Sequence, residues 1–358
     1  TLTGVDSVQY AGDMTYQALQ DYPVGGIVFA EDNIDSSSQF GTMTDNLQSY
    51  SEDISGLPLF LAAAEEGGSA SVLGNNDNLD EYYENSYSDD DSDYSSSSAN
   101  SVHSGAPSMS EIGRKDDSTN AYEAGKSIGS LMSAYGLNLD LAPVADVLSG
   151  NSNGIGDRTF GTDAQTVSDM ASEVIRGIQE EDVNAAMKYF PGYGAASSNM
   201  SGFPVINSSL DELKKKEFLP YSNAIAQGLD FIMVGHISVP NVTGDDTPAS
   251  LSEKMISEVL RKDLGFKGIV MTDYLNDKTI VKNYSAADAA VKAIQAGADL
   301  LLEPDDLEAA YEGVLRAVKK GDITEDRLDE SIYRILRVKI SMQDESSDAT
   351  ESESVSDY

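Results

Sequence analysis

The chain has no cysteine, which excludes disulfide bonds and thiol chemistry. No apolar run approaches the ~18–20 residues of a membrane-spanning helix, so membrane insertion is not expected. No signal peptide is visible, which predicts a chain that is either cytoplasmic or already processed for export. A lack of cysteine is compatible with bacterial export, and we expect an extracellular or cell-surface location, with the cytoplasm as the alternative.

Basic residues are scarce. The 23 lysines and arginines face 61 aspartates and glutamates, so the net charge is −38 at pH 7. Such a surface repels nucleic acid and anionic membranes, and it suits high-salt surroundings where screening relieves self-repulsion. Solubility alone explains the charge equally well. The 358 residues are 40% hydrophobic, which is ample for one large globular core.

Apolar runs alternate regularly with helical patterns along the chain. This alternation predicts an α/β fold with a parallel sheet, closed into a (β/α)8 TIM-barrel-like structure. Seven strands are predicted, at 25–29, 57–64, 137–143, 184–190, 230–236, 268–273 and 299–304. Helices are predicted at 8–19, 36–53, 118–135, 163–181, 209–227, 252–263, 285–296, 305–319 and 324–342. A full barrel needs eight strands, so either the first is missing or another segment fills its place.

We predict one barrel domain, residues 1–342. One acidic segment is inserted into this domain, and a second one follows it. The insertion at about 75–100 is rich in Ser and Tyr and has eight acids and no base. Its run Asp89–Asp93 offers oxygen ligands for calcium but lacks the spacing and central Gly of an EF-hand loop. We therefore favour a solvated loop and predict no metal site. Residues 343–358 carry six acids and are predicted to be a disordered tail.

The stretch from Ala186 to Gly194 is the strongest candidate for a functional loop. Its apolar beginning ends in Pro191, Gly192 and Gly194, which indicates a buried strand that breaks into a loop of unusual backbone freedom. In parallel α/β proteins the loops at the carboxyl ends of strands hold the active site. We therefore expect the active-site residues to cluster around this stretch.

This stretch is one of several motifs that are spread over residues 4 to 342. Together they resemble glycoside hydrolase family 3, in its β-N-acetylhexosaminidase branch, whose loop motif reads Lys-His-Phe-Pro-Gly-His-Gly. The matching segments are Lys188 with Phe190, Pro191, Gly192 and Gly194; Glu66–Gly68; Ala142–Val147; Asp157–Gly161; Gly265–Asp273; Ala296–Asp299; and Arg327–Ser331. The resemblance implies a single barrel, a retaining glycosidase reaction and no cofactor.

The resemblance also assigns roles to individual residues. Asp273, at the end of a predicted strand, matches the family nucleophile, although an Asp there can also cap the following helix. Lys188, Arg158 and Glu66 match positions that contact substrate. His236 also matches a rim position, where a sugar contact and a structural hydrogen bond are equally expected. A carboxylate such as Asp273 facing Lys188 and Arg158 would satisfy buried charge, which is also a purely structural explanation for the two cations.

The sequence departs from the family pattern where protons are transferred. The family's acid/base pair, an Asp and a His on a flexible loop, falls on Asn199 and Ser201, which do not titrate near neutral pH. Both motif histidines are tyrosines, Tyr189 and Tyr193, which add aromatic surface that stacks on a sugar or fills the pocket. The remaining histidine besides His236, His103, matches no motif.

The binding positions also change, since Ala64 and Ser69 stand where the family has Asp and Arg. These changes predict an impaired or non-catalytic protein, a pseudoenzyme that binds carbohydrate or has a structural role. The first alternative is an active retaining exo-β-glycosidase that hydrolyses O-glycosyl bonds with an acid/base not yet identified. The second is a subunit of a surface assembly, in which one chain completes the barrel of the next by self-association.

Overall fold

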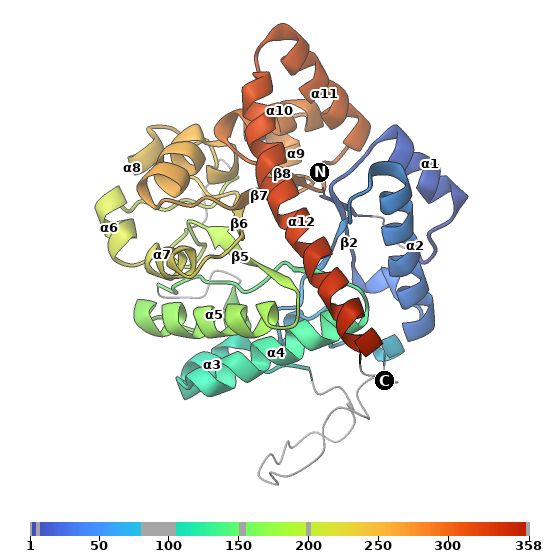
Figure 1. Ribbon diagram of the computed structural model, residues 1–358. Coiled ribbons are helices and arrows are strands. Elements are labelled where there is room, and N and C mark those ends of the chain that lie inside the picture. The colour runs from blue at the N-terminus through green and yellow to red at the C-terminus, as the bar shows by residue number, and fades with distance from the viewer. Residues whose placement is uncertain (1, 5–7, 80–104, 150–154, 198–201, 356–358) are drawn as a thin grey trace.

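A computed structural model describes residues 2–4, 8–79, 105–149, 155–197 and 202–355, with side chains as far as 343 (Figure 1). Most of the acidic insertion therefore lies outside the described residues, and so does its candidate calcium-binding run, Asp89–Asp93. His103, Asn199 and Ser201 also lie outside them.

Eight parallel strands form a closed barrel in which each strand pairs with its neighbours in sequence order. The strands are β1 (Leu2–Gly4), β2 (Gly26–Val28), β3 (Phe60–Ala63), β4 (Leu139–Asp140), β5 (Asn184–Phe190), β6 (Phe231–Val234), β7 (Ile269–Tyr274) and β8 (Leu300–Leu302). The predicted TIM-barrel fold is confirmed. Six of the seven predicted strands contain an observed one, and the seventh, predicted at 268–273, overlaps β7.

The eighth strand is β1, at the start of the chain, where we predicted none. Leu2 pairs with Gly26 of β2 and with Leu302 of β8, so this strand closes the seam. A strand of three residues is too short to show an alternation pattern, which explains why the sequence did not reveal it. Of the two alternatives, a missing strand and another segment in its place, the structure has the second, and the barrel leaves no open edge.

Helices surround the barrel as predicted, with some differences in their bounds. They are α1 (Asp13–Asp21), α2 (Ser37–Ser55), α3 (Met109–Lys115), α4 (Ser118–Ala134), α5 (Ala164–Gln179), α6 (Leu210–Lys215), α7 (Leu219–Ala226), α8 (Pro240–Thr243), α9 (Lys278–Asn283), α10 (Ala286–Ala296), α11 (Leu307–Lys320) and α12 (Glu325–Val355), with a π-helix at Lys254–Asp263. The helix predicted at 209–227 is split into α6 and α7. Pro220 lies in the first turn of α7, where its missing N–H costs no hydrogen bond.

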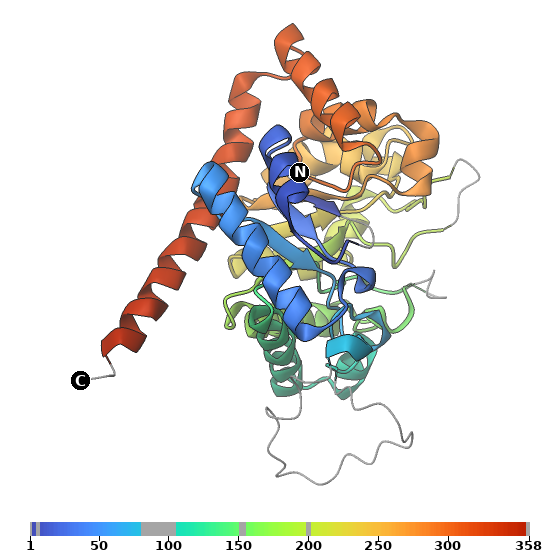
Figure 2. The ribbon, with the colours of Figure 1, turned by 90° about the vertical axis from the view of Figure 1, so that its right-hand side faces the viewer.

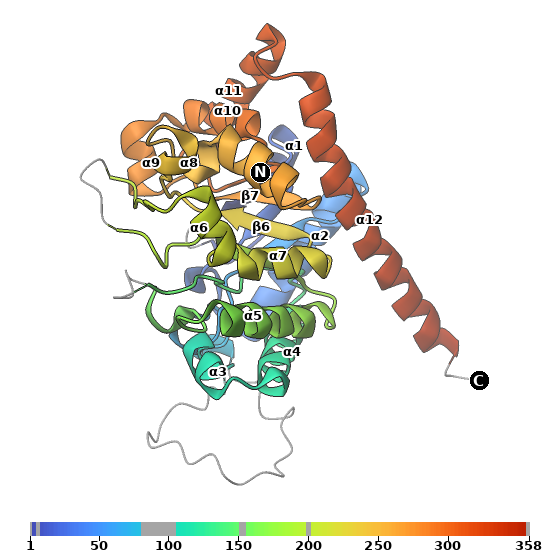
Figure 3. The same ribbon diagram turned by 90° about the vertical axis from the view of Figure 1, so that its left-hand side faces the viewer.

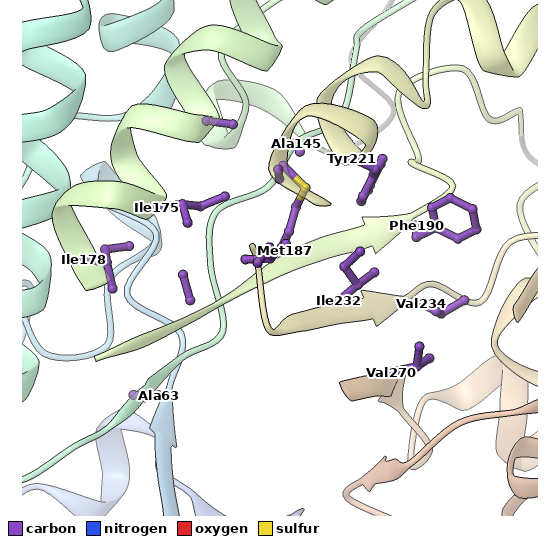
Figure 4. Close-up of a cluster of buried hydrophobic side chains, with 14 of the residues drawn as sticks. Ala63, Ala145, Ile175, Ile178, Met187, Phe190, Tyr221, Ile232, Val234 and Val270 are labelled. Carbon is purple, nitrogen blue, oxygen red and sulfur yellow. The ribbon is translucent and has the colours of Figure 1, made fainter. Parts of the chain in front are cut away.

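Two apolar layers hold the barrel together. Outside it, Met187 and Ile232 of the strands belong to one buried cluster with Ile175 and Ile178 of α5 (Figure 4). Inside it, strand side chains form a second cluster, in which the rings of Phe60 and Phe231 meet edge to face at 5.3 Å. The barrel is therefore a filled core, and ligands must bind at its ends.

Helix α12 crosses the amino-terminal end of the barrel, on the side away from the loops that follow the strands (Figures 2 and 3). Its Val338 packs against the inner cluster at this amino-terminal end. The helix continues to Val355, although we expected helix only to 342 and disorder from 343 onward. No Gly or Pro interrupts the sequence between Glu325 and Val355, so nothing in the backbone ends the helix earlier.

A buried ion cluster attaches α12 to the barrel. Asp299 directly precedes β8, and its side chain is fully buried. Its carboxylate pairs with Arg261 of the π-helix and, at 3.0 Å, with Arg334 of α12. Arg327 lies 3.5 Å from the same carboxylate, and Ser331 donates a hydrogen bond to it at 2.6 Å. One carboxylate therefore holds three arginines, from the two helices that flank it.

Candidate active site

The residues proposed for the site come from the carboxyl ends of several strands. Glu66 follows β3, and Arg158 ends a short 3-10 helix after β4. Lys188 is in β5, and Asp273 is the residue before the last in β7. All except Arg158 are at least nine-tenths buried. The closed barrel brings them to one end, as the strand-end rule predicts.

Glu66 forms the centre of the charged group. Arg158 donates two hydrogen bonds to its carboxylate, at 2.6 and 2.7 Å, and the Lys188 Nζ donates a third at 2.7 Å. Burial opposes ionisation of Glu66, but the charges of Lys188 and Arg158 outweigh it and lower its pKa. The carboxylate that satisfies the two cations is therefore Glu66 and not Asp273.

Asp273 pairs instead with a tyrosine. The Tyr193 hydroxyl donates to its Oδ2 at 3.1 Å, and the Tyr274 backbone N–H donates to its Oδ1 at 2.9 Å. The same hydroxyl accepts the backbone N–H of His236 at 3.1 Å. Burial raises the pKa of Tyr193 well above its usual value, and the nearby Asp273 carboxylate raises it further, so Tyr193 is a neutral donor.

The imidazole of His236 is used within the protein. Its Nε2 lies 2.8 Å from the carbonyl oxygen of Tyr274, which can only accept, so Nε2 carries a proton. Its Nδ1 lies 2.7 Å from the Ser250 hydroxyl, so both ring nitrogens have hydrogen-bond partners within the protein. Of the two readings that we kept open for His236, this geometry favours the structural one.

The two tyrosines of the motif lie between these polar groups. Their rings meet edge to face at 5.1 Å, and the Tyr189 hydroxyl accepts a hydrogen bond from Arg158 at 2.8 Å. Tyr189 is 9% exposed, and burial raises its pKa. Each tyrosine therefore bonds one charged group, Arg158 or Asp273, and the pair fills space between them.

Three further buried carboxyl groups lie at this end of the barrel, and sequence reasoning gave them no role. Asp146, in the Ala142–Val147 motif, accepts the Tyr193 backbone N–H at 2.9 Å, and burial raises its pKa to about 7. Burial also raises the pKa of Glu65 to about 7 and that of Asp140 well above its usual value. Their positions at or after strand ends were the signal that could have identified them.

The arrangement offers one carboxylate for nucleophilic attack and polar groups for binding. Among the described residues, no group of three or more histidine and carboxylate side chains is arranged to hold a metal ion. In the same part of the chain, no helix is long and apolar enough to cross a membrane. Asp273 is a carboxylate at the end of a barrel strand, which is where a barrel enzyme carries its catalytic groups. Retaining glycosidases use a carboxylate as nucleophile, so this end of the barrel is a candidate active site of that type.

The comparisons with known proteins identify the class. Residues 96–338 match the glycosyl hydrolase family 3 N-terminal domain, so the chain belongs to this family. It is 30% identical over 242 residues to beta-hexosaminidase LpqI of Mycobacterium tuberculosis, covering 65% of this chain and 62% of that protein. It is 25% identical over 346 residues to beta-hexosaminidase A of Pseudoalteromonas piscicida, covering 90% of this chain and 54% of that one.

Solved structures agree with this assignment. A family 3 beta-N-acetylglucosaminidase from Paenibacillus sp. superposes with a TM-score of 0.82 at 30% identity, covering 96% of this chain and 61% of the other. A family 3 member from Mycobacterium smegmatis gives a TM-score of 0.75 at 29% identity, covering 94% of both chains. Within its family the chain is therefore beta-hexosaminidase-like, and it spans 40–62% of the length of the first four curated relatives that it matches.

Proposed function

We propose that this protein binds a glycan with terminal β-linked N-acetylhexosamine and hydrolyses it poorly or not at all. The observation that supports this is the hydrogen bond from the Tyr193 hydroxyl to Asp273. Tyr193 stands where the motif has histidine, and a neutral phenol with a raised pKa is a poor proton carrier near pH 7. The carboxylate nucleophile is kept, while the side chain beside it donates a hydrogen bond instead of exchanging protons.

The reaction has two barriers, formation of the glycosyl-enzyme and its hydrolysis. An activated aryl leaving group needs little acid, so Asp273 alone can form the intermediate. Hydrolysis requires a base to activate water, and general acid–base help is worth ~10²–10⁴-fold. Turnover of an aryl glycoside is therefore expected to be slower by about this factor, and natural glycans are expected to lose more because both steps lack the helper.

Asp146 supports a second candidate, an active retaining exo-β-glycosidase. Its pKa of about 7 is suited to a group that both gives and takes a proton, and its carboxyl group is linked through Tyr193 to Asp273. Its 1% exposure counts against direct contact with a sugar unless the loop carrying Tyr193 moves. The surface-assembly alternative loses its main motivation, because β1 closes the barrel within one chain.

The experiment measures hydrolysis of an aryl β-N-acetylglucosaminide by the unmodified chain and by the Asp273→Asn and Asp146→Asn variants, with Asp230→Asn as control. Binding of N-acetylglucosamine oligomers is measured in parallel by calorimetry. We expect binding without ordinary turnover, and a gain of activity when Asn199→Asp and Ser201→His restore the family pair. Ordinary turnover that both Asp273→Asn and Asp146→Asn abolish would establish the exo-glycosidase instead.

A location outside the cell fits this proposal. The relatives include a protein described as an uncharacterized secreted glycosyl hydrolase of Arthroderma benhamiae, 28% identical over 335 residues. Fractionation of cells that make the native protein would test this point.

A further inference from the structure

A groove of about 300 Å³ lies at the amino-terminal end of the barrel, opposite the candidate active site. Its walls come from α1, α2, the segments that precede β2 and β3, and one face of α12. They are mostly apolar, with side chains such as Leu19, Ile54, Leu57 and Ile335. This volume is at the lower end of the range for small-molecule sites, so a ligand there must be small.

One wall residue carries a charge. Lys339 of α12 lines the groove, yet it is only 5% exposed. Its Nζ donates to the carbonyl oxygen of Pro58 and lies 4.9 Å from the centre of the Phe60 ring. Among the described side chains, no carboxylate forms an ion pair with it, whereas the other buried lysine of the barrel ends, Lys188, pairs with Glu66.

A buried ammonium without a counter-charge is costly, and here burial lowers the pKa of Lys339 to about 8. An ammonium has three N–H donors, and the Pro58 carbonyl accepts only one of them. The ring of Phe60 offers a second, weaker attraction to the cation. A ligand oxygen with a negative charge would supply both the missing acceptor and the missing charge.

We propose that this groove binds a small monocarboxylate with an unbranched apolar chain, its carboxylate on Lys339 and its chain along the apolar walls. The ammonium selects the head group, because a charge-assisted hydrogen bond is roughly twice as strong as a neutral one. The wall residues select the chain, because apolar area removed from water contributes about 25 cal/mol per Å². A polar sugar satisfies neither condition, so this site is separate from the proposed glycan site and does not depend on it.

The test measures calorimetric binding of octanoate, octanol and acetate to the full chain at pH 7 and 0.15 M salt. The variants are Lys339→Met, Lys339→Arg and, as a control for general charge, the exposed Lys320→Met. We expect the unmodified chain to bind octanoate more tightly than octanol, and acetate weakly. Lys339→Met is expected to weaken octanoate roughly 10- to 100-fold and leave octanol unchanged, as fits one hydrogen bond to a charged group.

The controls separate this reading from non-specific uptake. Lys339→Arg keeps the positive charge and should keep the preference for octanoate over octanol, and Lys320→Met should behave as the unmodified chain does. Failure of the unmodified chain to bind octanoate would overturn the proposal. So would equal affinity for octanoate and octanol, or unchanged octanoate affinity in Lys339→Met, since each shows that the ammonium does not select the ligand.

Discussion

Replacing Asp299 by asparagine tests whether the ion cluster at the foot of the barrel holds α12 in place. The substitution keeps the shape of the side chain and one acceptor oxygen but removes the negative charge that Arg261, Arg327 and Arg334 share. Of the three, Arg334 also pairs with the exposed Glu330. The three arginine side chains are 13–18% exposed, so water screens their mutual repulsion poorly. Removing one partner of a buried pair costs ~3–5 kcal/mol, and here three cations lose the same partner.

We therefore expect Asp299→Asn to lower the free energy of unfolding by about 3–5 kcal/mol, a large share of the ~5–15 kcal/mol of a typical protein. The assay is urea unfolding followed by circular dichroism. The matched control is Asp230→Asn, which breaks a pair with Arg337 of the same helix. Those side chains are 34% and 48% exposed, so the loss should be ~0–1 kcal/mol. Similar losses in the two variants would refute the reasoning.

Three further predictions use the same unfolding assay. Burial lowers the pKa of Lys339 from 10.5 to about 8, so the unfolded chain binds this proton more tightly than the folded chain does. The free energy of unfolding should therefore rise between pH 8 and pH 10.5, by on the order of 3 kcal/mol, and Lys339→Met should abolish that rise. Glu66→Gln leaves Lys188 buried without a negative partner and should cost ~3–5 kcal/mol, whereas a loss below 1 kcal/mol would show that the pair is unimportant for stability. Tyr193→Phe leaves the Oδ2 atom of Asp273 without its donor and should cost ~1–3 kcal/mol, and an unchanged midpoint would contradict the hydrogen bond.

The barrel was predictable because its strands are continuous apolar runs that alternate with amphipathic helices. The run at 184–190 corresponds to β5 at Asn184–Phe190, whose last six residues are fully or nearly buried. Strand β1 was not predictable, because Leu2–Gly4 contains a single apolar side chain and its place is fixed by pairing with β2 and β8. That pairing is long-range information, which no local pattern contains.

The membership of the site was predictable, but its pairings were not. The rule that strand ends carry functional side chains brought Glu66, Lys188 and Asp273 to the same end of the barrel. Which carboxylate meets Lys188 depends on loop paths and side-chain rotamers, and the sequence specifies neither directly. Asp146 was missed because its role depends on burial under the loop of Tyr193, and burial of a single Asp cannot be inferred from its neighbours in sequence.

The hydrogen bonds of Tyr193 limit what Asp273 can do. A phenol has one proton to donate, and here it is given to Asp273, while an oxygen lone pair accepts the backbone N–H of His236. A sugar hydroxyl that takes the same lone pair of the Asp273 Oδ2 atom must first displace this phenol. The backbone N–H of His236, which donates to this hydroxyl, then needs another acceptor, because an unsatisfied buried donor costs ~1–3 kcal/mol. A sugar that binds in this way requires movement of the Tyr193 side chain, and the energy of that movement is subtracted from the affinity for the sugar.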